Sequence, residues 1–155
     1  MAIGTSRSYN ITDDGANIER LRLHAGVKAG VGDFDDELKE YASVASAEID
    51  RLLTKAGVSP VPLTGTIPLE VLTAEAMMGG GAFKERAWSS GHDAPKALVR
   101  MEGKTAEEMV IDGSLTRRRG KALINSYIQH TYLDDPDATS PVGIFEAIED
   151  TPRWK

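Results

Sequence analysis

The chain contains no cysteine, and this absence removes several kinds of chemistry at once. Disulfide bonds, thiolate nucleophiles and zinc sites with cysteine ligands are all excluded. Apolar runs are only a few residues long, so the sequence predicts no membrane-spanning segment. The first dozen residues lack a basic region followed by an apolar one, and we therefore expect no signal peptide.

Basic residues are in the minority, with 18 lysines and arginines against 24 aspartates and glutamates. The net charge of −6 argues against a global attraction to nucleic acid but leaves a local basic patch open. Such a cluster is formed by Arg117, Arg118, Arg119 and Lys121. It is either a solvated face with salt bridges to the acidic excess, or a contact for an acidic partner or nucleic acid. Arginine suits the second role because its guanidinium binds phosphate and carboxylate through two hydrogen bonds.

The 155 residues are the length of one domain, and the spacing of the apolar residues predicts a mainly α fold, a small helical bundle. From Phe34 to Ala56, for example, apolar residues recur at steps of three and four. Prolines and β-branched residues over 58–67 predict a short extended segment or hairpin. Helices are expected over about 13–25, 33–56, 68–89, 105–113 and 115–132, with a short helical piece near 94–101.

Both termini are predicted to be extended. We expect a helical domain over 1–133, which includes an N-terminal arm, and a C-terminal arm over 134–155. Three prolines prevent one continuous helix in the C-terminal arm. Its large apolar side chains either fold back on their own domain or dock on another chain, and we favour docking. The candidate anchors are Phe145, Ile148 and Trp154.

Three consecutive glycines, Gly79, Gly80 and Gly81, interrupt a run that otherwise reads as helix. A phosphate-binding loop needs a strand before the glycines, and the preceding "PLEVLTAEAMM" reads as helix instead. The small and apolar positions from Leu69 to Ala87 keep helical spacing across the glycines. Each glycine costs about 1 kcal/mol relative to alanine in a helix. We therefore treat all three as candidate helix-packing residues that allow close approach of a neighbour, with a kink or hinge as the alternative. The spacing places Gly80 on the packed face and gives no specific reason for Gly79 and Gly81.

No pattern of residues indicates catalysis. His24, His92 and His130 are scattered and form neither an HExxH motif nor a pair one helical turn apart. The acidic clusters lack the alternating spacing of a calcium loop, and there is no Gly-x-Ser-x-Gly motif. We therefore predict that the protein is not an enzyme and has no catalytic, cofactor-binding or metal-ligating residues and no cofactor.

The order of elements over residues 12–88 resembles the head–tail connector (adaptor) proteins of tailed viruses. The segments that carry the resemblance are "NIERLRLHAGV" (17–27), "DFDDELKEYASVASAEIDRLLTKAG" (33–57) and "IPLEVLTAEAMMGGGAFKERAW" (67–88). The glycine triplet departs from that family's third helix, and residues 90–155 have no match in it.

The resemblance implies a structural virion protein, a helical connector domain without catalysis. Twelve copies would form a ring beneath the portal, and DNA would pass transiently through its lumen. The partners would be other copies of the chain, the portal protein and a tail-side connector or tail protein, with no membrane. The location would be the neck of the virion, assembled in the host cytoplasm. Arg117, Arg118 and Arg119 would face the lumen or an acidic partner.

Two alternatives stay open beside the connector. The first is a small helical DNA-binding regulator that uses the Arg117–Lys121 cluster, although the sequence shows no clear helix-turn-helix. The second is a small enzyme or ligand-binding protein that binds phosphate near Gly79–Gly81, which nothing else in the chain supports.

Overall fold

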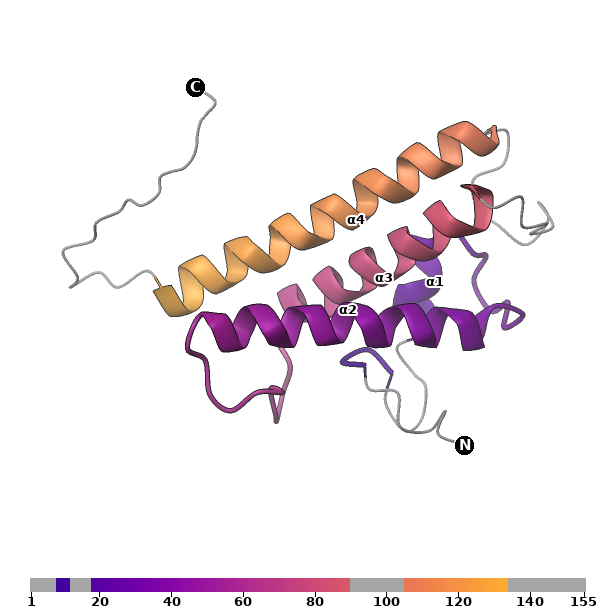
Figure 1. Ribbon diagram of the computed structural model, residues 1–155. Helices are drawn as coiled ribbons and strands as arrows, with labels where there is room; N and C mark the ends of the chain where they lie inside the picture. The colour runs from indigo at the N-terminus through magenta and orange to yellow at the C-terminus, as the bar shows by residue number, and fades with distance from the viewer. Residues whose placement is uncertain (1–7, 12–17, 90–104, 134–155) are drawn as a thin grey trace, which may run out of the picture.

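A computed structural model describes residues 8–11, 18–89 and 105–133. It confirms the mainly α fold: four α-helices form a small bundle, and the described residues contain no strand (Figure 1). None of the described helices is long and apolar enough to cross a membrane. The helices are α1 (Ile18–Ala25), α2 (Asp35–Lys55), α3 (Leu69–Ser89) and α4 (Ala106–Ile128), and a π-helical turn, η3 (Gln129–Leu133), follows directly after α4.

Local signals account for several helix ends. Three acidic residues occupy the first turn of α2 and Lys55 its last, which suits the helix dipole at both ends. Gly57 follows with a φ of 85°, a conformation that favours glycine over other residues. Thr105 caps α4 because its hydroxyl accepts a hydrogen bond from the Glu108 amide at 3.1 Å. The Glu108 carboxylate accepts in return from the Thr105 amide at 2.9 Å, which completes the predicted capping box.

Helix α3 is the centre of the bundle and runs unbroken through the three glycines, as the helical spacing predicts. Successive residues of a helix point about 100° apart, so three in a row face three directions. A methyl group added at Gly79 would meet the backbone of Ala42 in α2 at 3.1 Å. One added at Gly80 would meet the backbone of α1 at 2.8 Å, and one at Gly81 the backbone of α4 at 2.6 Å. Each glycine therefore lets a different helix approach α3.

The closest packing joins α3 to α4, which lie side by side over most of their length and run in opposite directions (Figure 1). A Cβ atom at Gly113 would lie 2.6 Å from the backbone nitrogen of Glu85, and one at Gly120 would lie 2.8 Å from the carbonyl oxygen of Ala74. These distances are too short for any side chain. The prediction of two helices separated near Gly113 is therefore wrong: Gly113 lies within α4 and serves packing rather than termination.

Apolar side chains fill the space around α3 in three clusters. The largest brings α2, α3 and the second half of α4 together, with Ile49, Leu53, Val71 and Ile124 fully buried. A second cluster surrounds Phe83, whose ring lies 5.6 Å from the Phe34 ring and 6.1 Å from the Tyr41 ring. The third joins α1, α2 and α3 through Leu21, Ala42 and Ala76.

The connections differ in part from the sequence prediction. Residues 58–67 form an irregular loop rather than a hairpin, with cis peptide bonds before Pro60 and Pro62. Helix α1 is described only from Ile18 onward. The expected helical piece near 94–101 and the C-terminal arm, with Phe145, Ile148 and Trp154, lie outside the described residues.

Candidate functional site

The outer face of α4 and η3 is a long exposed surface of the described bundle. α4 packs against α3 along one side, touches α2 sparsely, and leaves its opposite side open for about six turns. Side chains at helical spacing along this open side are exposed, and several are apolar. They include Ile111 (60% exposed), Leu115 (40%), Tyr132 (39%) and Leu133 (50%).

The basic cluster lies on this helix and divides into two pairs. Arg117 contacts Glu85 of α3, with 3.1 Å between Nε and the carboxylate, and Lys121 contacts Glu48 of α2 at the same distance. Arg118 and Arg119 are exposed, and neither makes an ion pair within the described residues. Each of the two interpretations of the cluster therefore fits a different pair of residues. Arg117 and Lys121 form salt bridges within the bundle, while Arg118 and Arg119 are exposed to a partner.

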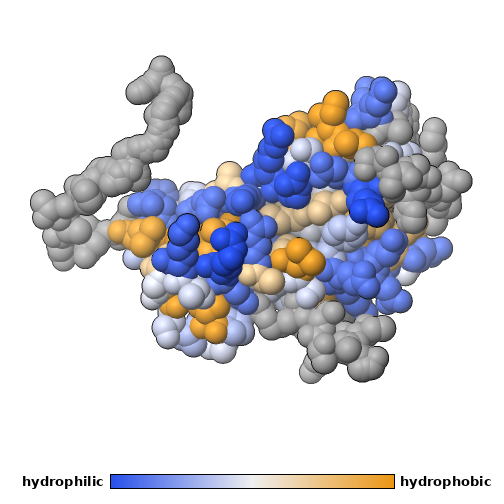
Figure 2. Space-filling model, viewed as in Figure 1, coloured by the Kyte–Doolittle hydropathy of each residue, from blue (hydrophilic) through white to orange (hydrophobic). Residues whose placement is uncertain are grey.

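The charge of the chain is unevenly distributed around this cluster. No acidic residue occurs between Asp112 and Asp134, and the run contains four basic residues. Since the whole chain carries −6 and this run carries +4, the remainder carries −10. The hydrophilic surface in Figure 2 is interrupted by separate apolar patches rather than one large patch. A positive segment over 113–133 on an acidic protein is suited to a local contact with an anionic partner.

Two aromatic side chains lie at the C-terminal end of the same helix. Tyr127 packs against the main apolar cluster, and its ring meets that of Tyr132 at 80° with 5.9 Å between centroids. Burial and a hydrogen bond with Tyr132 raise the pKa of Tyr127 to about 12. Tyr132 stands in the π-helical turn and is more exposed, so Tyr127 fixes a ring that faces solvent.

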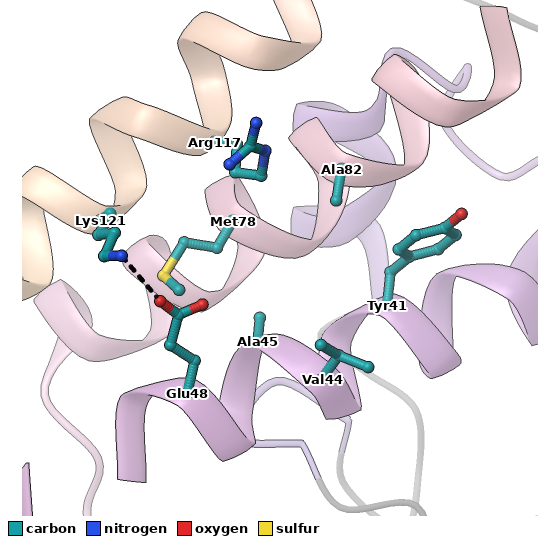
Figure 3. Close-up of a pocket in the computed structure, with 8 residues that line it drawn as sticks. All are labelled: Tyr41, Val44, Ala45, Glu48, Met78, Ala82, Arg117 and Lys121. Atoms are coloured by element: carbon teal, nitrogen blue, oxygen red, sulfur yellow. Dashed lines mark ion pairs between the residues drawn. The ribbon is translucent and has the colours of Figure 1, made fainter. Parts of the chain in front are cut away.

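A shallow pocket of about 110 Å³ lies between α2 and α4 over α3 (Figure 3). Its apolar floor is closed on one side by the Glu48–Lys121 ion pair. Pockets for small molecules usually measure roughly 300–1,000 Å³. This pocket is too small for that class of ligand. The lining residues are Tyr41, Val44, Ala45, Glu48, Met78, Ala82, Arg117 and Lys121.

Sequence reasoning missed a buried polar network around Glu75 in α3. Glu75 is completely buried and accepts hydrogen bonds from the Ser8 hydroxyl and the Tyr9 amide at 2.7 Å each. The Asn10 amide and side chain donate to it at 2.9 and 2.7 Å. Burial raises the pKa of Glu75, and these hydrogen bonds counter the rise in part. Residues 8–11, which the sequence assigns to an extended arm, are thereby held against the bundle.

Two buried cations also escaped prediction. The Arg22 guanidinium lies 2.6 Å from Asp35, and the Lys84 ammonium lies 2.6 Å from Asp112. The segment "AEAMMGGGAFK" contained a signal that Glu75 and Lys84 are buried. Small or apolar residues on every side of a helix indicate that the helix is enclosed on all sides. Its few charged residues are then buried with it and need partners.

The two histidines within the described residues lie on different elements, α1 and η3. His24 lies at the end of α1, where burial and the nearby Lys84 and Arg20 lower its pKa. His130 is exposed in η3, and His92 lies outside the described residues. Over residues 8–11, 18–89 and 105–133, no group of three histidine or acidic side chains is placed to hold a metal ion.

A comparison with curated proteins finds similarity to large ribosomal subunit protein uL1 of Leuconostoc citreum (strain KM20). The two are 30% identical over 115 residues, a match that covers 72% of this chain and 50% of the relative. The chain thus spans about half the length of the curated relative it matches. No family model matches the chain, and no solved structure matches it.

This finding overturns the resemblance to head–tail connector proteins. The named relative is a ribosomal protein, and no comparison points to a connector family. The predicted virion role, the twelve-membered ring and the portal and tail partners are therefore wrong. The resemblance rested on helix order and small residues, which many helical bundles share. The DNA-binding alternative receives no support from a ribosomal relative, and the enclosed glycines exclude a phosphate loop at Gly79–Gly81.

Proposed function

We propose that this chain is a non-catalytic RNA-binding subunit of a ribonucleoprotein assembly. The relative's name is that of a component of the large ribosomal subunit, and the open face of α4 has the chemistry such a role needs. The observation that carries the proposal is the pair of exposed arginines, Arg118 and Arg119, on a helix with no acidic residue after Asp112.

Physical reasoning links these arginines to phosphate. A guanidinium that already pairs with a carboxylate must give up that contact before it binds another anion, and Arg117 is in this position. Arg118 and Arg119 make no ion pair with another described residue, so they can bind phosphate without breaking one. They also extend from a regular helix. Because the rest of the chain is acidic, the binding is local and involves few phosphates. The protein acts by holding RNA in place and not by transforming it.

The test is the affinity for a fluorescently labelled RNA as a function of salt concentration. Two phosphate contacts on a single strand predict a slope of about −1.4 in a plot of log affinity against log salt. Replacing both Arg118 and Arg119 with alanine should remove most of the binding and flatten this slope. Replacing Arg51 and Lys55, two exposed cations on α2, removes the same charge from another face and is the matched control.

Two results would overturn the proposal. One is an absence of RNA binding by the unmodified chain at low salt. The other is an equal loss of affinity in the α4 and α2 double variants, because net charge rather than the α4 face would then control binding.

A further inference from the structure

A stripe of exposed side chains connects the exposed arginines to the aromatic end of α4. Arg118, Ala122, Asn125, Gln129 and Tyr132 follow one another at steps of four, three, four and three, which keeps them on one side of the helix. All five are exposed. At 1.5 Å per residue the stripe is about 21 Å long. We refer to these five residues as the α4 stripe.

The α4 stripe changes in chemistry along its length. It begins with a cation, continues through the small Ala122 and the two amides Asn125 and Gln129, and ends at an aromatic ring. A cation binds phosphate, an amide can donate to and accept from the edge of a base, and an aromatic ring stacks on the face of a base. The three functions needed to hold an unpaired nucleotide chain therefore occur in order on one rigid face.

Tyr132 is suited to stacking because its ring is held but not enclosed. Its contact with Tyr127 is edge to face, so Tyr127 covers at most one face of the Tyr132 ring. Tyr127 is itself packed against the main apolar cluster, which limits the movement of both rings. A fixed ring loses little conformational entropy when a base stacks on it, and this favours affinity.

We infer that the RNA bound by the α4 stripe is single-stranded, with a base stacked on Tyr132 and phosphate at Arg118. This inference rests on the proposed function and adds the class of RNA. Bases in a duplex already stack on their neighbours, and the deep, narrow major groove of an RNA duplex admits no side chains. Within a duplex, an exposed tyrosine finds no free base face on which to stack. An unpaired strand offers free base faces, and Ala122 leaves room for its backbone beside the helix.

The experiment compares a short labelled uridine oligomer with an RNA duplex of equal length, each titrated with the full chain by fluorescence anisotropy. The single strand should bind more tightly. Tyr132→Leu should lower its affinity about 5- to 150-fold, the range found for loss of one base stack. Tyr132→Phe keeps the ring and should retain most of the affinity, which makes it the matched control. Circular dichroism checks that each variant is folded.

A second readout reports stacking directly. In NMR spectra, the ring current of Tyr132 should shift the resonances of a bound uracil base, and the shift should persist in Tyr132→Phe and vanish in Tyr132→Leu. If the chain binds RNA through Arg118 and Arg119 but Tyr132→Leu binds like the unmodified chain, or the duplex binds equally well, this inference is wrong and the proposed function stands. If the chain binds no RNA, both fail.

Discussion

Replacing Gly81 with alanine should destabilise the bundle, although alanine is the better helix former. The added methyl group would lie 2.6 Å from the Arg117 amide nitrogen and 2.6 Å from the Gly113 carbonyl oxygen. Both are backbone atoms of α4, so the whole helix must shift to relieve the contact. Overpacking of this kind costs about 1–3 kcal/mol, and two backbone contacts indicate the upper end. Helix propensity returns about 1 kcal/mol, which leaves a net loss of about 2 kcal/mol.

This loss corresponds to a melting temperature lowered by roughly 4–8 °C for a domain of this size, and circular dichroism can measure it. Gly79→Ala is the graded comparison because its nearest neighbours lie at 3.1–3.3 Å. There the small strain and the gain in propensity nearly cancel, and we expect a change within about 1 kcal/mol. Ala122→Gly, on the exposed face, measures the propensity term alone. If Gly81→Ala proved as stable as the unmodified chain, close helix approach would not explain the glycine.

Three further predictions follow from the buried polar groups. Glu75→Ala removes the acceptor of the Tyr9 amide, so the free energy of unfolding should fall by roughly 2–4 kcal/mol. Hydrogen exchange of the Tyr9 amide should also accelerate, and unchanged exchange would count against the network. Asp112→Asn leaves the Lys84 ammonium buried without its counter-charge, so the free energy of unfolding measured in urea should fall by up to about 3 kcal/mol. Adding Lys84→Met should restore much of this loss. Ionisation of Tyr127 is disfavoured in the folded state, so stability should decline as pH rises from about 10 through 12, and Tyr127→Phe should reduce that decline.

The helices were largely predictable because their signals are local. The spacing of apolar residues predicts α2, the Thr105–Glu108 capping box marks the start of α4, and the small residues around the glycine triplet keep α3 in register. Glycine itself is ambiguous at this level. Gly57 adopts a positive φ and follows the end of α2, whereas Gly113 is helical and touches the backbone of Glu85. The sequence near each glycine does not contain the partner that decides between these outcomes.

The site was predictable only in part. The basic cluster is visible in the sequence. Which of its cations form ion pairs within the described bundle depends on Glu48 and Glu85, which come from other helices. The buried position of Glu75 depends in the same way on residues 8–10, which lie 65–67 positions earlier in the chain. Contacts over such separations arise from the packing of the bundle, and no short motif encodes them.

The packing of α3 also explains why α4 is available for binding. Three glycines allow three helices to surround α3, so α3 supplies the interior and α4 needs to contact it along only one side. The opposite side of α4 then has no packing role, and its residues need only be compatible with solvent. In a chain with 24 acidic residues among 155, about three would be expected in the 21 positions between Asp112 and Asp134, and none is found. Solubility alone does not require that exclusion, because acidic residues such as Asp36 and Glu40 occupy the exposed side of α2. The proposed RNA partner accounts for it, since each carboxylate there would repel phosphate.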